Sequence, residues 1–248
     1  MRAILTYHSL DSSGSPISLP PSVFRRHMEW LQEGRVRVVS VAELVALPAD
    51  ADAVSLTFDD GFANFASEAA PLLRANGYPA TVFIVTGHVG TDNRWRGRGE
   101  AGIPVLPLLG WDALGRLRES GIDLAAHTRT HPRLTALGTA ALDEELGAAK
   151  EEIRRRSGAA AEGFAYPYGE VDGRVTAAAA RYYRWACTTE LRPLGSRDAE
   201  MLLPRLDAWY FQNPARLSGW GTPAFRAWLW GRRQGRRLRR TLLAREHR

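Results

Sequence analysis

Two adjacent carboxylates, Asp59 and Asp60, stand at the end of an apolar run and are followed at once by Gly61. The run, residues 53–58, is short and rich in β-branched and aromatic side chains, which predicts a buried strand. Neighbouring strand residues point to opposite sides, so one carboxylate could bind a cation while the other keeps a lone pair for a proton. An Asp-Asp-Gly turn, in which aspartate bonds its own backbone, is the alternative interpretation.

Two histidines, His127 and His131, lie four residues apart further along the chain. This spacing can bring two ring nitrogens to one cation, and two histidines with a carboxylate form a ligand set typical of a catalytic divalent metal. Thr128 stands where zinc proteases of the His-Glu-x-x-His type carry glutamate, and Pro132 disfavours a continuing helix, so that class is disfavoured. A pair of surface histidines without a ligand is the alternative.

Predicted strands and helices alternate along the chain, which indicates a parallel α/β architecture. The expected strands are residues 3–7, 36–39, 53–58, 81–85, 122–126, 164–166 and 185–188. The expected helices are residues 21–33, 65–76, 111–120, 139–157 and 175–182, with glycines after the first, second and fourth as stop signals. The glycine- and proline-rich residues 86–110 are expected to form a long loop.

Five polar residues come directly after predicted strands, namely His8, Asp59, Asp60, His127 and Tyr168. In α/β barrels and in open parallel sheets, functional sites form at this end of the strands. We therefore expect these side chains to converge on one site.

The segments 57–61, 127–131 and 164–169, in this order, resemble motifs of the polysaccharide deacetylase family, which carries the NodB homology domain and is carbohydrate esterase family 4. The resemblance covers roughly residues 1–210 and implies one domain with a distorted (β/α) barrel fold, for which we predict residues 1–221. It also implies metal-dependent removal of N- or O-acetyl groups from sugars.

The resemblance implies roles for individual residues. Asp59 would be the general base, and Asp60, His127 and His131 would hold the metal. The backbone N–H of Tyr168 would contribute to an oxyanion hole. Zn²⁺ is the expected ion, with Co²⁺, Ni²⁺ and Mn²⁺ as alternatives because ligand type alone does not choose among them.

Two departures from the family pattern concern the catalytic groups. The third motif usually carries an arginine that braces the base, and Ala165 occupies that position here; Arg205 is expected to substitute for it from another strand. The family also carries a histidine near the C-terminus of the barrel that acts as the general acid, and this sequence has no counterpart there. His8, however, lies in a segment similar to the N-terminal motif of the permuted poly-N-acetylglucosamine deacetylase subgroup. We expect His8 to be the general acid, since first and last strands are neighbours in a closed barrel.

The predicted function is that of a metal-dependent hydrolase that removes N-acetyl groups from an amino-sugar-containing glycan or a lipid-linked sugar. Two alternatives stay open. One is a deformylase acting on a lipid-linked amino sugar. The other is a degenerate relative that binds glycan without turnover, which Ala165 suggests.

The composition of the 248-residue chain, 45% hydrophobic and 24% charged, suits one globular domain. The single cysteine, Cys187, excludes an intrachain disulfide and a cysteine-based zinc site. The first residues are too short and polar for a signal peptide, and no apolar run reaches the length of a membrane span. These features predict a cytoplasmic protein.

Residues 222–248 contain nine arginines and one glutamate, a net charge of +8, so the remaining residues carry −2 of the total of +6. We expect this basic aromatic tail to be helical. It is interpreted either as a solvated helix with one packed face or as a peripheral contact with an anionic membrane at its inner face. Nucleic acid is the least favoured partner.

Overall fold

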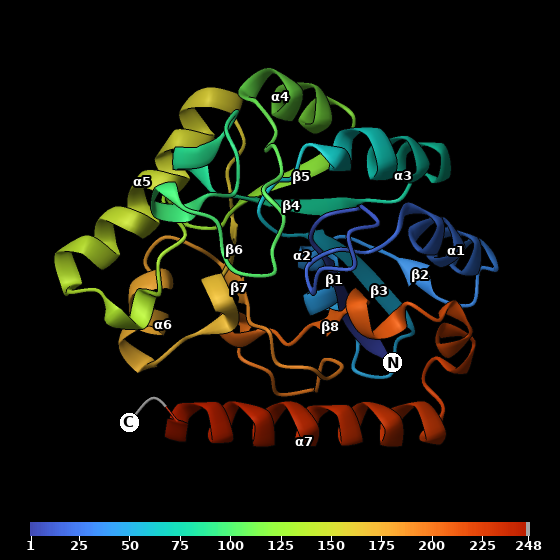
Figure 1. The fold of residues 1–248 in the computed structure, drawn as a ribbon. Helices are drawn as coiled ribbons and strands as arrows, with labels where there is room; N and C mark the ends of the chain where they lie inside the picture. The colour runs from blue at the N-terminus through green and yellow to red at the C-terminus, as the bar shows by residue number, and fades with distance from the viewer. Residues whose placement is uncertain (247–248) are drawn as a thin grey trace.

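The computed structural model describes residues 1–246 and shows a curled sheet of parallel strands with helices around it (Figure 1). The strands are β1 (Arg2–Tyr7), β2 (Arg37–Val38), β3 (Ala53–Phe58), β4 (Ala80–Ile84), β5 (Ile122–Ala126), β6 (Gly163–Ala165), β7 (Trp185–Cys187) and β8 (Leu206–Asp207). The helices are α1 (Pro21–Gln32), α2 (Val41–Ala46), α3 (Ala70–Asn76), α4 (Trp111–Glu119), α5 (Thr139–Ser157), α6 (Gly173–Ala179) and α7 (Pro223–Glu246).

The sheet has the strand order β7-β6-β5-β4-β3-β1-β8, and β2 pairs with the start of β3. The two edges meet through one segment, because Leu203 forms a parallel bridge to Cys187 of β7 and the following β8 pairs with Leu5 and Thr6 of β1. The sheet therefore curls into a distorted (β/α) barrel, and the expected adjacency of the first and last strands is confirmed.

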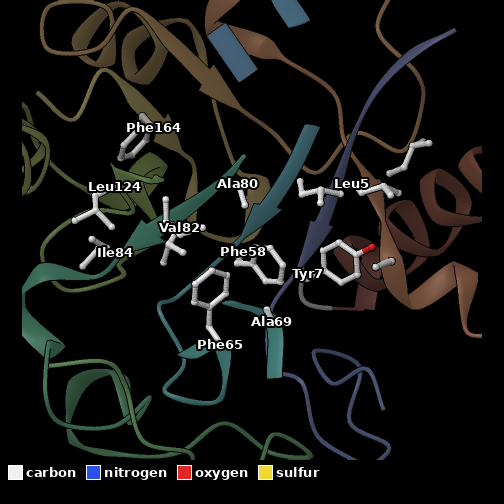
Figure 2. Packing of buried hydrophobic residues seen from close by; sticks show 14 of the residues in the cluster. Leu5, Tyr7, Phe58, Phe65, Ala69, Ala80, Val82, Ile84, Leu124 and Phe164 are labelled. Carbon is white, nitrogen blue, oxygen red and sulfur yellow. The ribbon is translucent and has the colours of Figure 1, made fainter. Parts of the chain in front are cut away.

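Side chains alternate between the two faces of the sheet, as the strand geometry requires. Those on the outer face form the larger core beneath the helices, and Figure 2 shows Leu5, Phe58, Val82 and Phe164 among them. The inner face holds a smaller apolar cluster. Its members on the strands and on the segment before β8 are Ile4, Ala53, Phe83, Ala125, Ala165, Trp185, Cys187 and Leu203. Any Cβ at Gly163 would lie 2.2 Å from the Trp185 ring, so glycine is needed there for the indole to fill the barrel.

The predicted helix ends are confirmed at two glycines. Gly77 follows α3 with a φ of 63°, and Gly158 follows α5 with a φ of 69°. Both are left-handed residues after the last turn, where glycine carries no Cβ penalty. A π-helical turn, Phe65–Ala69, leads into α3.

Helix α7 covers residues 223–246 of the predicted basic tail, whose last two residues lie outside the described residues, and it runs along one side of the barrel, across the molecule from α3 and α4 (Figure 1). Its first turns are packed, since Phe225 and Leu229 are 5% and 2% exposed and belong to the larger core. Trp230 on the same helix is 63% exposed. Within residues 1–246, no helix combines the length and the apolar character that crossing a bilayer requires.

Candidate active site

The carboxyl ends of β1, β3, β5 and β6 meet at one mouth of the barrel. Six of the predicted site residues line a cavity of about 130 Å³ at this mouth: His8, Asp59, Asp60, His127, His131 and Tyr168. The structure thus brings together residues that are up to 160 positions apart in the sequence. Arg205, the remaining predicted residue, precedes β8 and contacts Asp59 from inside the barrel.

Asp60, His127 and His131 form a cluster in which one ligand atom from each lies within 4.8 Å of the others. The Nε2 atoms of the two histidines are 3.4 and 3.5 Å from Asp60 Oδ1. His127 Nδ1 lies 2.7 Å from the carbonyl oxygen of Ala165, so a proton on Nδ1 donates to that carbonyl and leaves the Nε2 lone pair facing Asp60. Such a second hydrogen bond is the usual way in which a metal-binding histidine is oriented.

The electrostatics of this cluster fit a cation. Burial raises the pKa of Asp60, although the nearby His127 opposes this effect. Burial also holds the pKa of His131 well below its ordinary value, and His127 adds to this effect, so the His131 imidazole is neutral. Asp60 Oδ1 is buried and has no hydrogen-bond partner among the described residues. A buried carboxylate oxygen without a partner is costly, and a divalent cation held between Asp60 and the two histidines would compensate it.

Asp59 is held by Arg205. The guanidinium donates from Nη1 and Nη2 to the two oxygens of the Asp59 carboxylate at 2.6 and 2.7 Å, and both side chains are almost completely buried. Burial alone would raise the pKa of Asp59, but the charge and hydrogen bonds of Arg205 outweigh it and place that pKa well below its usual range. Asp59 is therefore ionised at every physiological pH. Arg205 thus contacts the Asp59 carboxylate in the way expected of the arginine that is replaced by Ala165 in the third motif.

His8 lies on the solvent side of Asp59. Its Nε2 is 3.6 Å from Asp59 Oδ2, and its side chain is 24% exposed, compared with 3% for Asp59. A histidine at the edge of the cavity can exchange protons with solvent while it faces the substrate. His27, in contrast, is fully buried and bonds the Tyr7 hydroxyl and the Phe211 carbonyl oxygen.

The backbone around the cavity is strained. Of the five described non-glycine residues with positive φ, four belong to the predicted motifs: Asp60, Thr128, His131 and Tyr168, with φ from 58° to 69°. Each such residue costs on the order of 1–3 kcal/mol, and this strain gathers where function requires a particular geometry.

The loop that carries both histidines is fixed from outside by α5. The Glu145 carboxylate accepts hydrogen bonds from the N–H groups of Arg129 and Thr130 at 2.9 and 2.8 Å and from the Thr130 hydroxyl at 2.6 Å. The Thr128 hydroxyl accepts from the His131 N–H at 2.9 Å. These contacts fix the backbone of the loop up to His131 before any ligand arrives.

The long loop at residues 86–110 supplies residues that the sequence did not identify. Asn93, Glu100 and Ile103 line the cavity, and the Tyr168 hydroxyl donates to Glu100 at 2.8 Å. The Trp95 ring lies 4.6 Å from that of His131 and is 8% exposed. The irregular loop has no hydrophobic periodicity from which the position of Trp95 could be predicted.

Comparisons with known proteins agree with this geometry. The sequence model of the polysaccharide deacetylase family matches residues 46–184. YxkH of Bacillus subtilis, whose name places it among the polysaccharide deacetylases, is 25% identical over 194 residues, which are 75% of this chain and 64% of YxkH. The chain therefore spans less than two thirds of that relative.

Two solved structures share the fold. The deacetylase PplD of Streptococcus pyogenes, solved with acetate, superposes with a TM-score of 0.70 at 22% identity, over 83% of this chain and 91% of PplD. IcaB of Ammonifex degensii superposes with a TM-score of 0.68 at 20% identity, over 84% of this chain and 93% of IcaB. His8 and Arg205 lie outside the matched family range, and the metal cluster and Asp59 lie within it. By this match and by its fold, the chain belongs to the polysaccharide deacetylase family.

Proposed function

We propose that the protein is a divalent-metal-dependent hydrolase that removes an N-acetyl group from an amino sugar, in a glycan or in a lipid-linked sugar. The observation that carries this proposal is the buried cluster of Asp60, His127 and His131 directly beside an ionised Asp59. A protein that only binds sugar has no need of a charged base next to a cation site. This supports an enzyme over the glycan-binding alternative.

Asp60, His127 and His131 would hold the metal, and their two imidazoles with one carboxylate favour Zn²⁺. When bound, the ion would supply Lewis-acid polarisation of the acyl carbonyl and lower the pKa of water. The three side chains would leave part of the coordination sphere open toward the cavity, where Asp59 and His8 also lie.

The net reaction adds water across the amide, so that the C–N bond breaks, a C–O bond forms, and a carboxylate and an amine are released. Asp59 would orient the attacking water and accept its proton. His8, which lies beside Asp59 on its solvent side, would donate a proton to the departing amine nitrogen. General acid–base assistance of this kind contributes about 10²- to 10⁴-fold. The Tyr168 N–H would donate to the oxyanion, a contribution of about 3–4 kcal/mol.

Arg205 would act as a positioning residue for the base. Its two hydrogen bonds fix the plane of the Asp59 carboxylate, and its charge keeps Asp59 ionised. Arg205 would thus replace the bracing arginine of the family's third motif, where this chain has Ala165. This supports retained activity rather than degeneration.

Metal content and product release test the proposal together. The purified protein is expected to contain about one divalent ion per chain, and the His127→Ala/His131→Ala variant is expected to lose it. The His88→Ala variant, which changes a histidine outside the cluster, is expected to keep the ion and serves as the matched control. If the wild type binds no Zn²⁺, Co²⁺, Ni²⁺ or Mn²⁺ when each is supplied, the proposal is wrong.

Product analysis then identifies the acyl group. Acetate and formate are measured in parallel with N-acetylated and N-formylated amino sugars, because formate release alone would favour the deformylase alternative. Asp59→Asn is expected to keep the metal and to lose at least about 10²-fold in turnover. Normal turnover in this variant would refute the assignment of the base.

A further inference from the structure

A second, larger cavity adjoins the active site. It measures about 450 Å³, more than three times the catalytic cavity, and lies between α7 and the segments that follow β6 and β7. Cavities of about 300–1,000 Å³ are typical of sites that bind whole small molecules. The catalytic cavity, at about 130 Å³, is large enough for an acyl group and water, so most of a substrate must lie outside it.

The two cavities share a wall. Thr189 lines both, and Gly169, which lines the larger one, directly follows Tyr168 of the active site. A Cβ at Gly169 would lie 2.0 Å from Thr189 Oγ1, so the two residues are in close contact at this wall. Because Thr189 borders both cavities, a substrate with its acyl group at the cluster of Asp60, His127 and His131 could reach the larger cavity.

Charged side chains dominate the lining of the larger cavity. Three arginines, Arg192, Arg233 and Arg236, face two carboxylates, those of Glu190 and Asp198. The excess is one positive charge. A wall of this composition favours an anionic ligand over a neutral one.

The carboxylates are already engaged by two of the arginines. Arg192 forms a two-pronged pair with Asp198, with both distances at 2.7 Å, and its Nε lies 3.6 Å from Glu190. Glu190 also pairs with Arg233. These pairs fix the arginine side chains before a ligand binds, which lowers the entropic cost of binding.

Donors remain available in this cavity. Within the described part of the chain, Arg236 has no ion-pair partner, and its guanidinium lies 5.8 Å from the centre of the Tyr210 ring. Arg233 Nε is buried without a hydrogen-bond partner among the described residues. A planar guanidinium with free N–H groups matches the geometry of a carboxylate or phosphate.

We propose that this cavity is an anion subsite, in which Arg236 and Arg233 bind a carboxylate or phosphate group of the substrate while its acylated nitrogen lies at the metal cluster. The substrate would then be an acidic amino-sugar compound rather than a neutral glycan. This inference rests on the proposed deacylase function.

The first experiment compares substrates and variants. Wild type, Arg236→Gln and Arg226→Gln are assayed on an N-acetylated amino sugar in neutral, carboxylated and phosphorylated forms. Arg226 is an exposed arginine of the same helix outside the cavity, so its variant carries the same change in charge. A charge-assisted hydrogen bond contributes about 1.5–3 kcal/mol, which corresponds to roughly 10- to 100-fold in affinity.

We expect the wild type to prefer one acidic form over the neutral form, chiefly through a lower KM. Arg236→Gln should reduce this preference at least about tenfold, and Arg226→Gln should preserve it. The acidic form that is preferred shows whether the group is a carboxylate or a phosphate. Equal use of neutral and acidic forms by the wild type, or equal effects of the two variants, would overturn the anion subsite while leaving deacylation intact.

A binding measurement keeps the test independent of turnover. Inorganic phosphate and glucuronate are titrated into the three proteins by calorimetry at low salt. Binding that weakens in Arg236→Gln and not in Arg226→Gln supports the subsite even if no substrate is hydrolysed, in which case only the proposed function fails. Absence of binding of both anions to the wild type, together with absence of an acidic preference, refutes the subsite.

Discussion

Replacement of Arg205 by methionine is the sharpest test of how the base is held. Methionine is apolar and unbranched, so it fills most of the space and removes only the charge and its donors. Arg205 is 1% exposed and donates to both oxygens of Asp59, and its Nε donates to the Thr188 carbonyl oxygen at 3.0 Å. The variant therefore leaves Asp59 as a buried carboxylate without its partner.

The expected loss is large. Breaking a buried pair by removing one partner costs about 3–5 kcal/mol of the free energy of unfolding. The upper part of that range applies here, because the Thr188 carbonyl also loses its donor, which costs a further 1–3 kcal/mol or so before relaxation. Such a loss is a major fraction of the total stability of a domain.

The pH dependence gives this prediction its specificity. In the wild type the depressed pKa of Asp59 contributes stability above the unfolded-state pKa of about 3.9, and that stability is lost as the pH falls. In Arg205→Met the strongest group that opposes burial is gone, so we expect the Asp59 pKa to rise above 3.9 and the ionised carboxylate to destabilise the fold as the pH increases. The difference between the two proteins should therefore widen from pH 4 to pH 7, by about 1.4 kcal/mol for each unit by which the Asp59 pKa of the variant lies above pH 4.

Urea unfolding at pH 4, 5.5 and 7 measures this difference. Arg184→Met, which breaks the exposed pair with Glu162, is the matched control and is expected to show no such widening. The double variant Asp59→Asn/Arg205→Met should lose less stability than the sum of the single variants, since each single change strands a buried group. A loss below about 1 kcal/mol, or one that is equal at pH 4 and pH 7, would refute the reasoning.

Three further predictions follow from other parts of the molecule. Burial lowers the pKa of His27 to about 4, so between pH 6.5 and pH 4 the unfolded chain binds a proton at this histidine that the folded chain does not bind. The free energy of unfolding should therefore fall by up to about 3 kcal/mol over this range. In urea titrations, His27→Gln should reduce this dependence on pH. Gly169→Ala should lower stability and activity, because Gly169 has a φ of +68° and its new Cβ would collide with the Thr189 hydroxyl. Gly138→Ala should lower neither, because the new Cβ would have no atom within 4 Å. If α7 contacts anionic membranes, Trp230→Ser/Leu238→Ser should reduce flotation with anionic vesicles without a change in Tm, and unchanged flotation would refute the contact.

Local sequence rules predicted much of the scaffold. The apolar run at 53–58 coincides with β3, and the stripe from 139 to 157 coincides with α5, whose four buried residues are the ones at helical spacing: Leu142, Leu146, Ala149 and Ile153. These elements were predictable because one side of each is buried and the period of the pattern reports which side. The family and its (β/α) barrel were also predictable, since residues 57–61 and 127–131 resemble motifs of that family.

The loop at residues 86–110 was predicted, but the residues that it contributes to the cavity were not. Residues 86–110 have no hydrophobic period, so no local rule could assign Asn93 to the cavity wall or pair Glu100 with Tyr168. The tail at 222–248 was separable by charge, but charge did not reveal that Phe225 and Leu229 pack into the larger core.

The sequence by itself determined which groups are available: two adjacent carboxylates, two histidines four apart, and strands that end at them. Only the tertiary structure decided which of these groups touch. Arg205 reaches Asp59 across 146 positions because the segment before β8 joins the two edges of the sheet, and α7 brings Arg233 and Arg236 beside the loop after β7. The physical reason is that side-chain type and period are local properties, whereas ion pairs and cavities depend on how distant segments close the barrel.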